Sequence, residues 1–381
     1  MGLHDQYGLT QVINARGPFT PVGVSRSGER VAAAAAEALS GFFVMEELQD
    51  LASRTIARVT GAEAGTVVHC TASAITLSVA ASMTGQAPER VAALPDTTGM
   101  PARVVVPAVH AIDYGHPLLQ DVRLAGATPV LAGSDTECTL ADLEAALAHP
   151  DTTCLLLVSS RLVRGAFVPF DRAVAAAHRR GVPVVVDGAA QDLRIGELLG
   201  TGADLVAVSG QKYLGSPTAG LVIGRAGMVG AVRAQEKGIG RAMKASKEAV
   251  IGVLTALRVR QELDLDAWRR EQTDKAARFV ERAGTLPGIT ASADRDPTGL
   301  PFPRARIAVD PAEAGLDATA VATALRTGSP SIWLMTHDQD KGELLLELVP
   351  LTDGEFEVVL ARLAEILAHP PQDQDRARVS A

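Results

Sequence analysis

The chain has 381 residues, of which 47% are hydrophobic and 21% are charged, so it contains enough apolar material for a large buried core. These values exclude an intrinsically disordered chain, a collagen and a coiled coil as descriptions of the whole sequence. The 36 basic and 44 acidic residues give a formal charge of −8. This balance disfavours a nucleic-acid-binding protein, because binding to phosphates needs an excess of cations.

The cysteines and the N-terminal residues bear on the location of the protein. Cys70, Cys138 and Cys154 are spaced neither as zinc ligands nor as the disulfide framework of a small secreted domain. The first 14 residues contain no apolar signal segment, and no apolar run approaches the roughly 18 residues that a membrane helix needs. We therefore expect a cytoplasmic protein with neither a membrane nor a nucleic acid as its partner.

Apolar runs alternate with amphipathic stretches from about residue 66 to residue 224, which is typical of strand–helix units in a mostly parallel sheet. Runs such as CLLLV and VPVVVDG lack polar alternation, as expected for strands buried on both faces. The sequence predicts an α/β fold with one seven-stranded sheet. Strands are expected at residues 66–69, 103–108, 128–132, 153–159, 182–187, 205–209 and 220–224, and helices at 72–84, 140–149 and 171–180.

One connection in this region is too short for a parallel crossover. Between the segments VAVSG and AGLVIG lie only eight residues, 211–218, whereas a crossover between parallel strands needs about a dozen or more. We therefore expect one antiparallel strand in the sheet, directly after a turn that contains a lysine.

The alternation of apolar runs and amphipathic stretches ends after residue 224. Residues 244–270 predict one or two helices that leave the sheet domain, and strands at 304–309, 331–336 and 344–348 with a helix at 353–367 predict a smaller α+β domain. The predicted organisation is an N-terminal segment at 1–30, a large domain at 31–255, a small C-terminal domain at 256–370 and a flexible, polar tail at 371–381.

A carboxylate, a hydroxyl and an amine are expected at one edge of the sheet. One predicted strand ends at Asp187, and another ends at Ser209, three residues before Lys212. Ligands of such sheets bind outside the carboxyl ends of the strands. Only six of the 36 basic residues are lysines and none precedes Lys212. Because arginine supplies the basic surface residues of this chain, solubility does not explain a lysine at this position. The alternative is that Asp187 caps a helix and Lys212 lies in a surface turn.

Together these groups predict a pyridoxal phosphate site. The amine would form the Schiff base, the carboxylate would keep the pyridine nitrogen protonated, and hydroxyl and amide groups would bind the phosphate. The segment Cys70-Thr71-Ala72-Ser73 follows a predicted strand and opens an apolar helix, so its N–H groups and hydroxyls suit a phosphate. Taken alone, this segment is equally an ordinary helix start capped by a hydroxyl side chain.

Several longer segments carry a family resemblance. They are VINARG, SGFFVMEELQDLASRTIARVTGAEAGTVVHCTASAITLSVAASMTG, VVVDGAAQ, SGQKYLGSPTAGLVIG and GRAMKASKEAVIGVLTALR. Over about residues 10–350, the chain resembles the selenocysteine synthase-like group of fold-type-I pyridoxal phosphate enzymes, nearest to its D-glucosaminate-6-phosphate ammonia-lyase-like branch. The resemblance implies an aminotransferase-type large domain, a smaller C-terminal α+β domain and a homodimer.

The resemblance also implies roles for individual residues. Lys212 would be the Schiff-base lysine, Asp187 would bind the pyridinium nitrogen, and His110 would lie near the ring. The residues implied around the phosphate are Thr71, Ala72, Ser73 and Ser209.

Departures from the group concern the substrate. The motif VINA is usually followed by a small residue, whereas this chain has Arg16. Arg16 is either a clamp for a substrate carboxylate or phosphate or a surface arginine, and Arg164 in SSRLVRG is a second candidate for substrate binding. Because VINARG begins at Val12, we expect no tRNA-binding domain before it and no seryl-tRNA substrate. His110 and His116 lack the spacing of metal ligands, so no metal is expected.

The expected reaction is α,β-elimination from a 2-amino-3-hydroxy acid, which yields a 2-keto-3-deoxy acid and ammonia. Lys212 would take the Cα proton, and His110 or Lys212 would protonate the departing hydroxyl. A racemase or epimerase, an aminotransferase and a cofactor-binding protein without turnover remain open. Ser209 to Lys212 also spell the S-x-x-K motif of penicillin-recognising serine hydrolases, but the accompanying SDN and KTG elements are missing.

Overall fold

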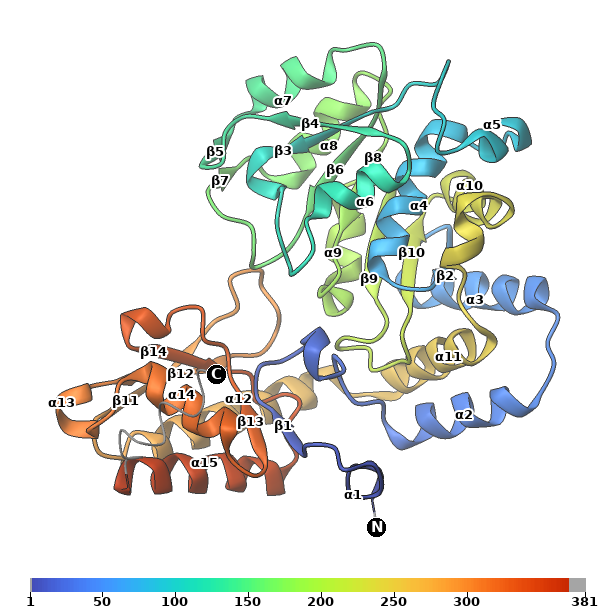
Figure 1. Cartoon of the computed structure of the whole chain (residues 1–381). Coiled ribbons are helices and arrows are strands. Elements are labelled where there is room, and N and C mark those ends of the chain that lie inside the picture. Colours follow the sequence, from blue (N-terminus) through green and yellow to red (C-terminus); the bar gives the residue numbers. More distant parts are fainter. Residues whose placement is uncertain (1, 370–381) are drawn as a thin grey trace. The chain divides into compact units, whose positions relative to one another are not determined.

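The computed structural model describes residues 2–369, which fall into two compact units (Figure 1). The sheet unit is Ser27–Glu262, and the terminal unit combines Met1–Arg26 with Leu263–Ala381. The sequence prediction divided the chain after residues 30 and 255 instead. The flexible tail predicted at 371–381 lies outside the described residues.

The sheet unit is built on seven strands in the order β2-β10-β9-β8-β6-β3-β4. All neighbours are parallel except β10, which is antiparallel to both β9 and β2. The predicted sheet and its single antiparallel strand are thus confirmed, and the short connection before β10 accounts for the reversal. The strands are β2 (Ala64–Val68), β3 (Arg103–Pro107), β4 (Thr128–Ala132), β6 (Thr152–Val158), β8 (Val184–Asp187), β9 (Leu205–Ser209) and β10 (Gly220–Gly224).

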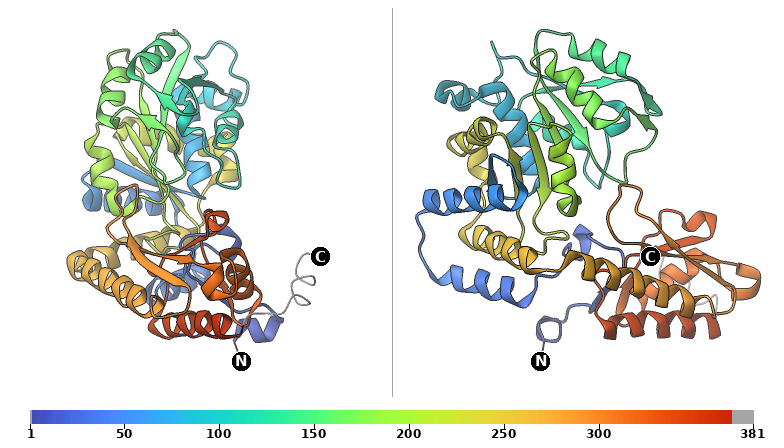
Figure 2. Two further views of the ribbon diagram at one scale, coloured as in Figure 1. Left: turned by 90° about the vertical axis from the view of Figure 1, so that its left-hand side faces the viewer. Right: turned by 180° about the vertical axis from the view of Figure 1, so that it is seen from behind.

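Helices cover both faces of this sheet (Figures 1 and 2). Successive strand residues enter opposite hydrophobic clusters: Val185 packs on one face, and Val184 and Val186 pack on the other. This explains why the strand sequences are apolar at every position. One face is covered by α4 (Thr71–Thr84), α6 (Leu118–Leu124) and α10 (Ala226–Ala234), and the other by α3 (Met45–Thr60), α7 (Leu140–Leu147), α8 (Phe170–His178), α9 (Ile195–Gly200) and α11 (Lys247–Glu262).

Smaller elements complete the sheet unit. Helix α2 (Glu29–Ser40) packs on α11, α5 (Pro88–Ala93) follows α4, and β5 (Glu137–Cys138) pairs in parallel with β7 (Ala166–Phe167). The β5–β7 ladder has only two residue pairs and was not predicted. Among residues 2–369, no helix combines the length and the apolar character needed to span a membrane.

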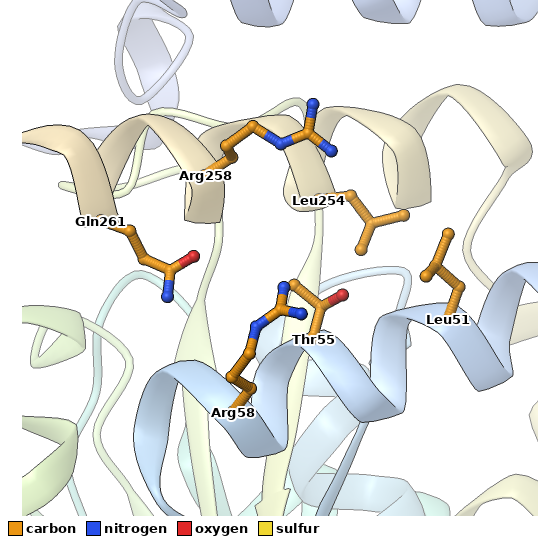
Figure 3. A pocket seen from close by; sticks show the side chains of 6 residues that line it. All are labelled: Leu51, Thr55, Arg58, Leu254, Arg258 and Gln261. Carbon is orange, nitrogen blue, oxygen red and sulfur yellow. The ribbon is translucent and has the colours of Figure 1, made fainter.

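A pocket of about 220 Å³ opens between α3 and α11 (Figure 3). None of the predicted site residues lines it. Its lining consists of Leu51, Thr55, Arg58, Leu254, Arg258 and Gln261.

The terminal unit joins the two ends of the chain. Residues 12–14 form β1 (Val12–Asn14), which pairs in parallel with β13 (Ser331–Trp333). The strand predicted at 331–336 is therefore shorter and lies outside the antiparallel sheet, because the N-terminal segment supplies its partner. That sheet contains β11 (Ile289–Asp294), β12 (Arg304–Val309) and β14 (Glu343–Leu346), and the helices are α1 (Leu3–Tyr7), α12 (Leu265–Ala283), α13 (Pro311–Ala314), α14 (Ala318–Thr327) and α15 (Asp353–Ala368).

Two helix-to-strand turns of the sheet unit provide a matched test of the packing. Gly126 and Gly181 have φ angles of +85° and +70°, but a Cβ atom at Gly126 would lie 2.2 Å from the carbonyl oxygen of Pro95, whereas one at Gly181 meets nothing within 4 Å. We expect Gly181→Ala to lower the free energy of unfolding by about 1 kcal/mol through backbone strain, and Gly126→Ala to lower it by about 3 kcal/mol or more. Urea unfolding followed by circular dichroism measures both, and equal losses would contradict the prediction.

Candidate active site

The carboxyl ends of β6, β8 and β9 form a single edge of the sheet. Val158 lies opposite Asp187 in the β6–β8 ladder, and Asp187 lies opposite Ala207 in the β8–β9 ladder. Beyond the strands, the Ser209 N–H donates to the carbonyl oxygen of Ala189 over 3.0 Å. The backbone thus fixes the positions from which Asp187 and Lys212 extend.

The Asp187 carboxyl is buried and oriented. Asp187 is only 4% exposed to solvent, and its Oδ1 accepts a hydrogen bond of 2.9 Å from the Ala189 N–H. Burial raises the pKa of this carboxyl from its usual 3.8 to about 6, Lys212 and the Ala189 N–H oppose that rise, and Asp121 adds to it. At neutral pH the carboxyl is therefore mostly ionised and can hold a cationic N–H group.

Lys212 lies in a tight turn between β9 and β10. Its carbonyl oxygen accepts from the Gly215 N–H, and the Ser216 N–H returns to the carbonyl oxygen of Gly210 over 2.8 Å. A Cβ atom at Gly210 would lie 2.4 Å from Ser216 Oγ, so this turn needs glycine. The position of Lys212 is thus set by backbone hydrogen bonds and a close approach.

The Lys212 amine is electrostatically coupled to its surroundings without being hydrogen-bonded. Burial lowers the pKa of Lys212, Asp187 and Asp192 oppose this effect, and the Arg161 guanidinium reinforces it. Within residues 2–369 the amine forms neither a hydrogen bond nor an ion pair. An amine of lowered pKa with no fixed partner, close to a carboxylate, suits covalent attachment to an aldehyde.

The start of α4 has the features of a phosphate site. The side chain of the N-cap residue Cys70 accepts from none of the helix N–H groups, and its Sγ lies 3.3 Å from Ser73 Oγ, so the first N–H groups of α4 lack an intrahelical acceptor. Thr71 Oγ1 is buried and has no hydrogen-bond partner within the described chain. A Cβ atom at Gly220 of β10 would lie 2.4 Å from the carbonyl oxygen of Cys70, so β10 packs tightly beneath this turn. These unsatisfied donors fit a bound phosphate.

The structure brings the six predicted cofactor residues into this one region. Asp187, Ser209 and Lys212 come from adjacent strand ends. The α4 residues Thr71, Ala72 and Ser73 lie where β10, the neighbour of β9, passes Cys70. The buried donors, the carboxylate and the amine therefore match the chemical groups of pyridoxal phosphate.

Sequence reasoning missed Arg161 and Asp192. Both act on the Lys212 amine, and Asp192 is held by Arg260 over 3.1 Å. The predicted Arg164 is exposed, and its side chain has no ion pair with another described residue. Sequence position was the signal that could have identified Arg161, because this residue follows the end of β6 at Val158 more closely than Arg164 does.

A second missed group consists of Asp121 in α6 and Tyr114 in the loop before that helix. Asp121 is buried, with 1% exposure. Its carboxylate accepts a hydrogen bond of 2.8 Å from Tyr114 Oη and lies 2.8 Å from His116 Nε2. Burial and the Asp121 hydrogen bond raise the pKa of Tyr114, and the charge of Asp187 adds to the effect. This loop is therefore electrostatically coupled to the Asp187 site.

His110 is buried beside the end of β6. Its Nδ1 accepts a hydrogen bond of 3.2 Å from the Val158 N–H, and its ring centroid lies 4.4 Å from that of Phe167. Burial lowers the pKa of His110 to about 4, so the imidazole is uncharged at neutral pH. An uncharged imidazole with this environment is a poor proton donor, which leaves Lys212 as the remaining predicted donor.

Arg16 belongs to the terminal unit. Its guanidinium carbon lies 3.9 Å from the centroid of the Phe19 ring, and its Nη1 donates to the carbonyl oxygen of Leu334 over 3.4 Å. The structure thus shows Arg16 as a held side chain lining a cavity of its own unit.

Comparison with known proteins is consistent with this geometry. Residues 120–341 match the family model "Aminotransferase class-V". The D-glucosaminate-6-phosphate ammonia lyase of Salmonella typhimurium is 33% identical over 372 residues, which cover 96% of this chain and 98% of that protein. The 5'-C-glycyluridine monooxygenase-decarboxylase of a Streptomyces species is 34% identical over 367 residues, which cover 96% and 92%.

Other relatives are more distant. The L-seryl-tRNA(Sec) selenium transferase of Nitratidesulfovibrio vulgaris is 27% identical over 82% of this chain and 70% of that protein. The expected resemblance to the selenocysteine synthase-like group and its ammonia-lyase-like branch is confirmed.

Solved structures agree on the fold. A structure of D-glucosaminate-6-phosphate ammonia-lyase matches with a TM-score of 0.88 and 33% identity over 97% of this chain and 99% of that one. An alanine–glyoxylate aminotransferase from Nostoc matches with a TM-score of 0.62 at 19% identity, over 96% and 100% of the two chains, and supports the fold alone. The chain is therefore a member of the aminotransferase class-V family, a pyridoxal phosphate-dependent enzyme of fold type I.

Proposed function

We propose that this enzyme catalyses α,β-elimination from a 2-amino-3-hydroxy acid and releases a 2-keto-3-deoxy acid and ammonia. The observation that carries the proposal is the Lys212 amine of lowered pKa beside the buried Asp187 carboxylate. It stands in a chain that is 33% identical, over nearly its whole length, to an ammonia lyase.

The compounds named for two relatives support the substrate class. D-glucosaminate-6-phosphate and 5'-C-glycyluridine each carry an amino group on one carbon and a hydroxyl on the next. The reaction names of these relatives differ, one being an ammonia lyase and the other a monooxygenase-decarboxylase. The substrate class is thus supported by both relatives, and elimination by one of them.

The proposed site assigns a task to each residue. When bound, the cofactor supplies an aldehyde for attachment and a cationic ring that withdraws electrons from Cα. Lys212 holds the cofactor, and Asp187 keeps the ring nitrogen protonated because its own carboxyl is ionised at neutral pH. The phosphate is held by the start of α4 and the end of β9, through Thr71, Ala72, Ser73 and Ser209.

Lys212 also moves the protons of the reaction. Burial and the nearby Arg161 favour its uncharged form, which is the form that takes the Cα proton. The Cα–H and Cβ–O bonds break, a carbon–carbon double bond forms, and the ammonium of Lys212 returns a proton to the hydroxyl, which leaves as water. The released enamine then takes up one water and gives the keto acid and ammonium. Arg164 is proposed to bind an anionic group of the substrate, whereas Arg16, the other candidate from the sequence, lines a cavity of the terminal unit.

We propose a cytoplasmic homodimer with a small-molecule substrate and no nucleic-acid partner. Three free thiols, Cys70, Cys138 and Cys154, support a reducing compartment. An exposed apolar segment supports self-association, because isolated proteins rarely expose such clusters. Its members are Leu39, Phe42, Phe43, Val44 and Met45.

The reaction is tested by proton NMR in deuterium oxide with D-glucosaminate, its 6-phosphate, serine and threonine as substrates. We expect a keto acid with one solvent deuterium at C3 and an equal amount of ammonium, and no turnover by Lys212→Ala. Exchange of the Cα proton without a keto acid would indicate a racemase or epimerase. Transfer of the amino group to an added keto acid would indicate an aminotransferase, and uptake of dioxygen with release of carbon dioxide would indicate the reaction of the other relative.

The phosphate site is tested by two threonines of α4. Thr71 Oγ1 is buried without a partner, whereas Thr76 Oγ1 donates to the carbonyl oxygen of Asp121 over 3.0 Å. We expect Thr71→Val to weaken cofactor binding about tenfold without loss of apoprotein stability, because one charged hydrogen bond is worth about 1.5 kcal/mol or more. Thr76→Val should instead lower apoprotein stability by about 1 kcal/mol and leave cofactor affinity nearly unchanged. Absorbance titration with cofactor and urea unfolding separate the two effects, and the reverse pattern would refute the phosphate assignment.

Ionisation of the buried Asp187 carboxyl lowers the stability of the apoprotein, although catalysis needs that ionised form. Because burial raises its pKa to about 6, the apoprotein loses stability as the pH rises from about 4 through 6, by about 3 kcal/mol for a shift of about two units. Asp187→Asn removes this loss, so the variant apoprotein should unfold at a higher urea concentration than the parent at pH 7.5, and the difference should shrink to about a third at pH 4.5. Its kcat should fall at least about a hundredfold, since an amide cannot hold a cationic ring nitrogen. A variant apoprotein less stable at pH 7.5 would contradict this account.

A further inference from the structure

The terminal unit contains a cavity of about 300 Å³ that the proposed reaction does not use. This volume is at the lower end of the range of small-ligand pockets. The cavity is lined by Arg16, by one face of α14, by β13 with the residues that follow it, and by Gln339. It therefore brings together segments from both ends of the chain.

The lining carries positive charge only. It includes the guanidinium groups of Arg16 and Arg326 and no carboxylate. Within residues 2–369, the Arg326 guanidinium forms no ion pair. Asp338, next to the lining residue Gln339, is already paired with Lys341 over 2.8 Å. A locally cationic cavity in a chain of net charge −8 favours an anionic ligand.

The Arg16 side chain is held in place before any ligand binds. The centroid of the Phe19 ring lies 3.9 Å from its guanidinium carbon. The Asn14 side chain fixes the backbone turn, because it accepts a hydrogen bond of 3.0 Å from the Arg16 N–H and donates one of 2.8 Å to the carbonyl oxygen of Gly17. Gly17 has a φ angle of +81°, and a Cβ atom there would lie 2.6 Å from the Glu347 carboxylate. A guanidinium fixed in this way loses little entropy on binding an anion.

Helix α14 supplies the other polar groups. Thr319, Thr323 and Arg326 line the cavity and lie on one face of the helix, four and three residues apart. The helix is fixed at its start by Asp317, whose Oδ1 accepts from the Ala320 N–H over 2.7 Å. Threonine hydroxyls and the two guanidinium groups provide hydrogen bonds to a tetrahedral or planar oxyanion.

We propose that this cavity binds the phosphate or carboxylate group of a small anionic ligand between Arg16 and Arg326. Trp333 forms part of the wall beside these groups. The proposal rests on the terminal unit alone and does not depend on the reaction proposed above. Phosphate esters and carboxylates share the chemistry that the cavity recognises, and matched probes distinguish them.

The test uses Trp333 as its reporter. The chain has two tryptophans, and Trp268 packs edge-on against Phe302 with ring centroids 6.0 Å apart, so Trp268→Phe keeps an aromatic ring there and leaves Trp333 as the sole tryptophan. The holoenzyme with this change is titrated with glycerol 3-phosphate, glycerate and glycerol, and Trp333 fluorescence is recorded. We expect a saturable change with one or both of the anions and none with neutral glycerol.

Three arginine variants in the Trp268→Phe background decide where the anion binds. Arg16→Gln and Arg326→Gln should each raise the dissociation constant at least tenfold. Arg295→Gln should leave it unchanged, because Arg295 is exposed in the same unit and lies outside the lining. If Arg16→Gln fails to fold, as judged by circular dichroism, Thr323→Val retains both guanidinium groups and should still weaken binding several-fold. No saturable change with either anion, an equal response to glycerol, or the same loss in Arg295→Gln would overturn the proposal.

Discussion

Burial acts in the same sense on the Asp187 carboxyl and the Lys212 amine, since it pushes each of them toward its uncharged form. Their mutual attraction opposes that effect, and the balance leaves a carboxylate that is ionised at neutral pH beside an amine that loses its proton readily. Both conditions depend on keeping the two groups close and out of water. The rest of the sheet unit meets this need, because β8 and β9 are adjacent parallel strands and their carboxyl ends are joined by the Ser209 to Ala189 hydrogen bond.

Two polar side chains that lack a partner within the described chain, Thr71 and Arg326, lie where ligands are proposed to bind. Along α4, the hydroxyls of Thr76 and Thr84 have hydrogen-bond partners, whereas those of Thr71 at the helix start and of Ser78 are buried without one. A buried hydroxyl without a partner lowers stability by roughly 1–3 kcal/mol, so a phosphate that binds it recovers that free energy. The Arg326 guanidinium also has no ion-pair partner within the described chain, but it lowers the stability of the fold less than Thr71 does, because it is exposed to water until an anion binds.

The features that were predicted from the sequence depend on short stretches of chain. Apolar runs located the seven strands, the eight-residue connection fixed the direction of β10, and strand ends located Asp187 and Lys212. The features that were missed depend on contacts between distant segments or on loop conformation. The β1–β13 pairing joins residues from opposite ends of the chain, and the lowered pKa of His110 results from burial among residues such as Phe167. No local pattern encodes either contact, whereas the position of Arg161 near the end of β6 was a sequence signal for its action on Lys212.

The parallel pairing of β1 with β13 also orders the assembly of the chain during synthesis. Residues 27–262 form a continuous unit, so a ribosome can release all of its strands before the C-terminal segment exists. The terminal unit cannot be completed at that stage, because Val12–Asn14 must wait for Ser331–Trp333 to emerge. The first strand of the polypeptide is therefore among the last to find its partner, and a fragment beginning at Leu263 would lack both that strand and the Arg16 side of the cationic cavity.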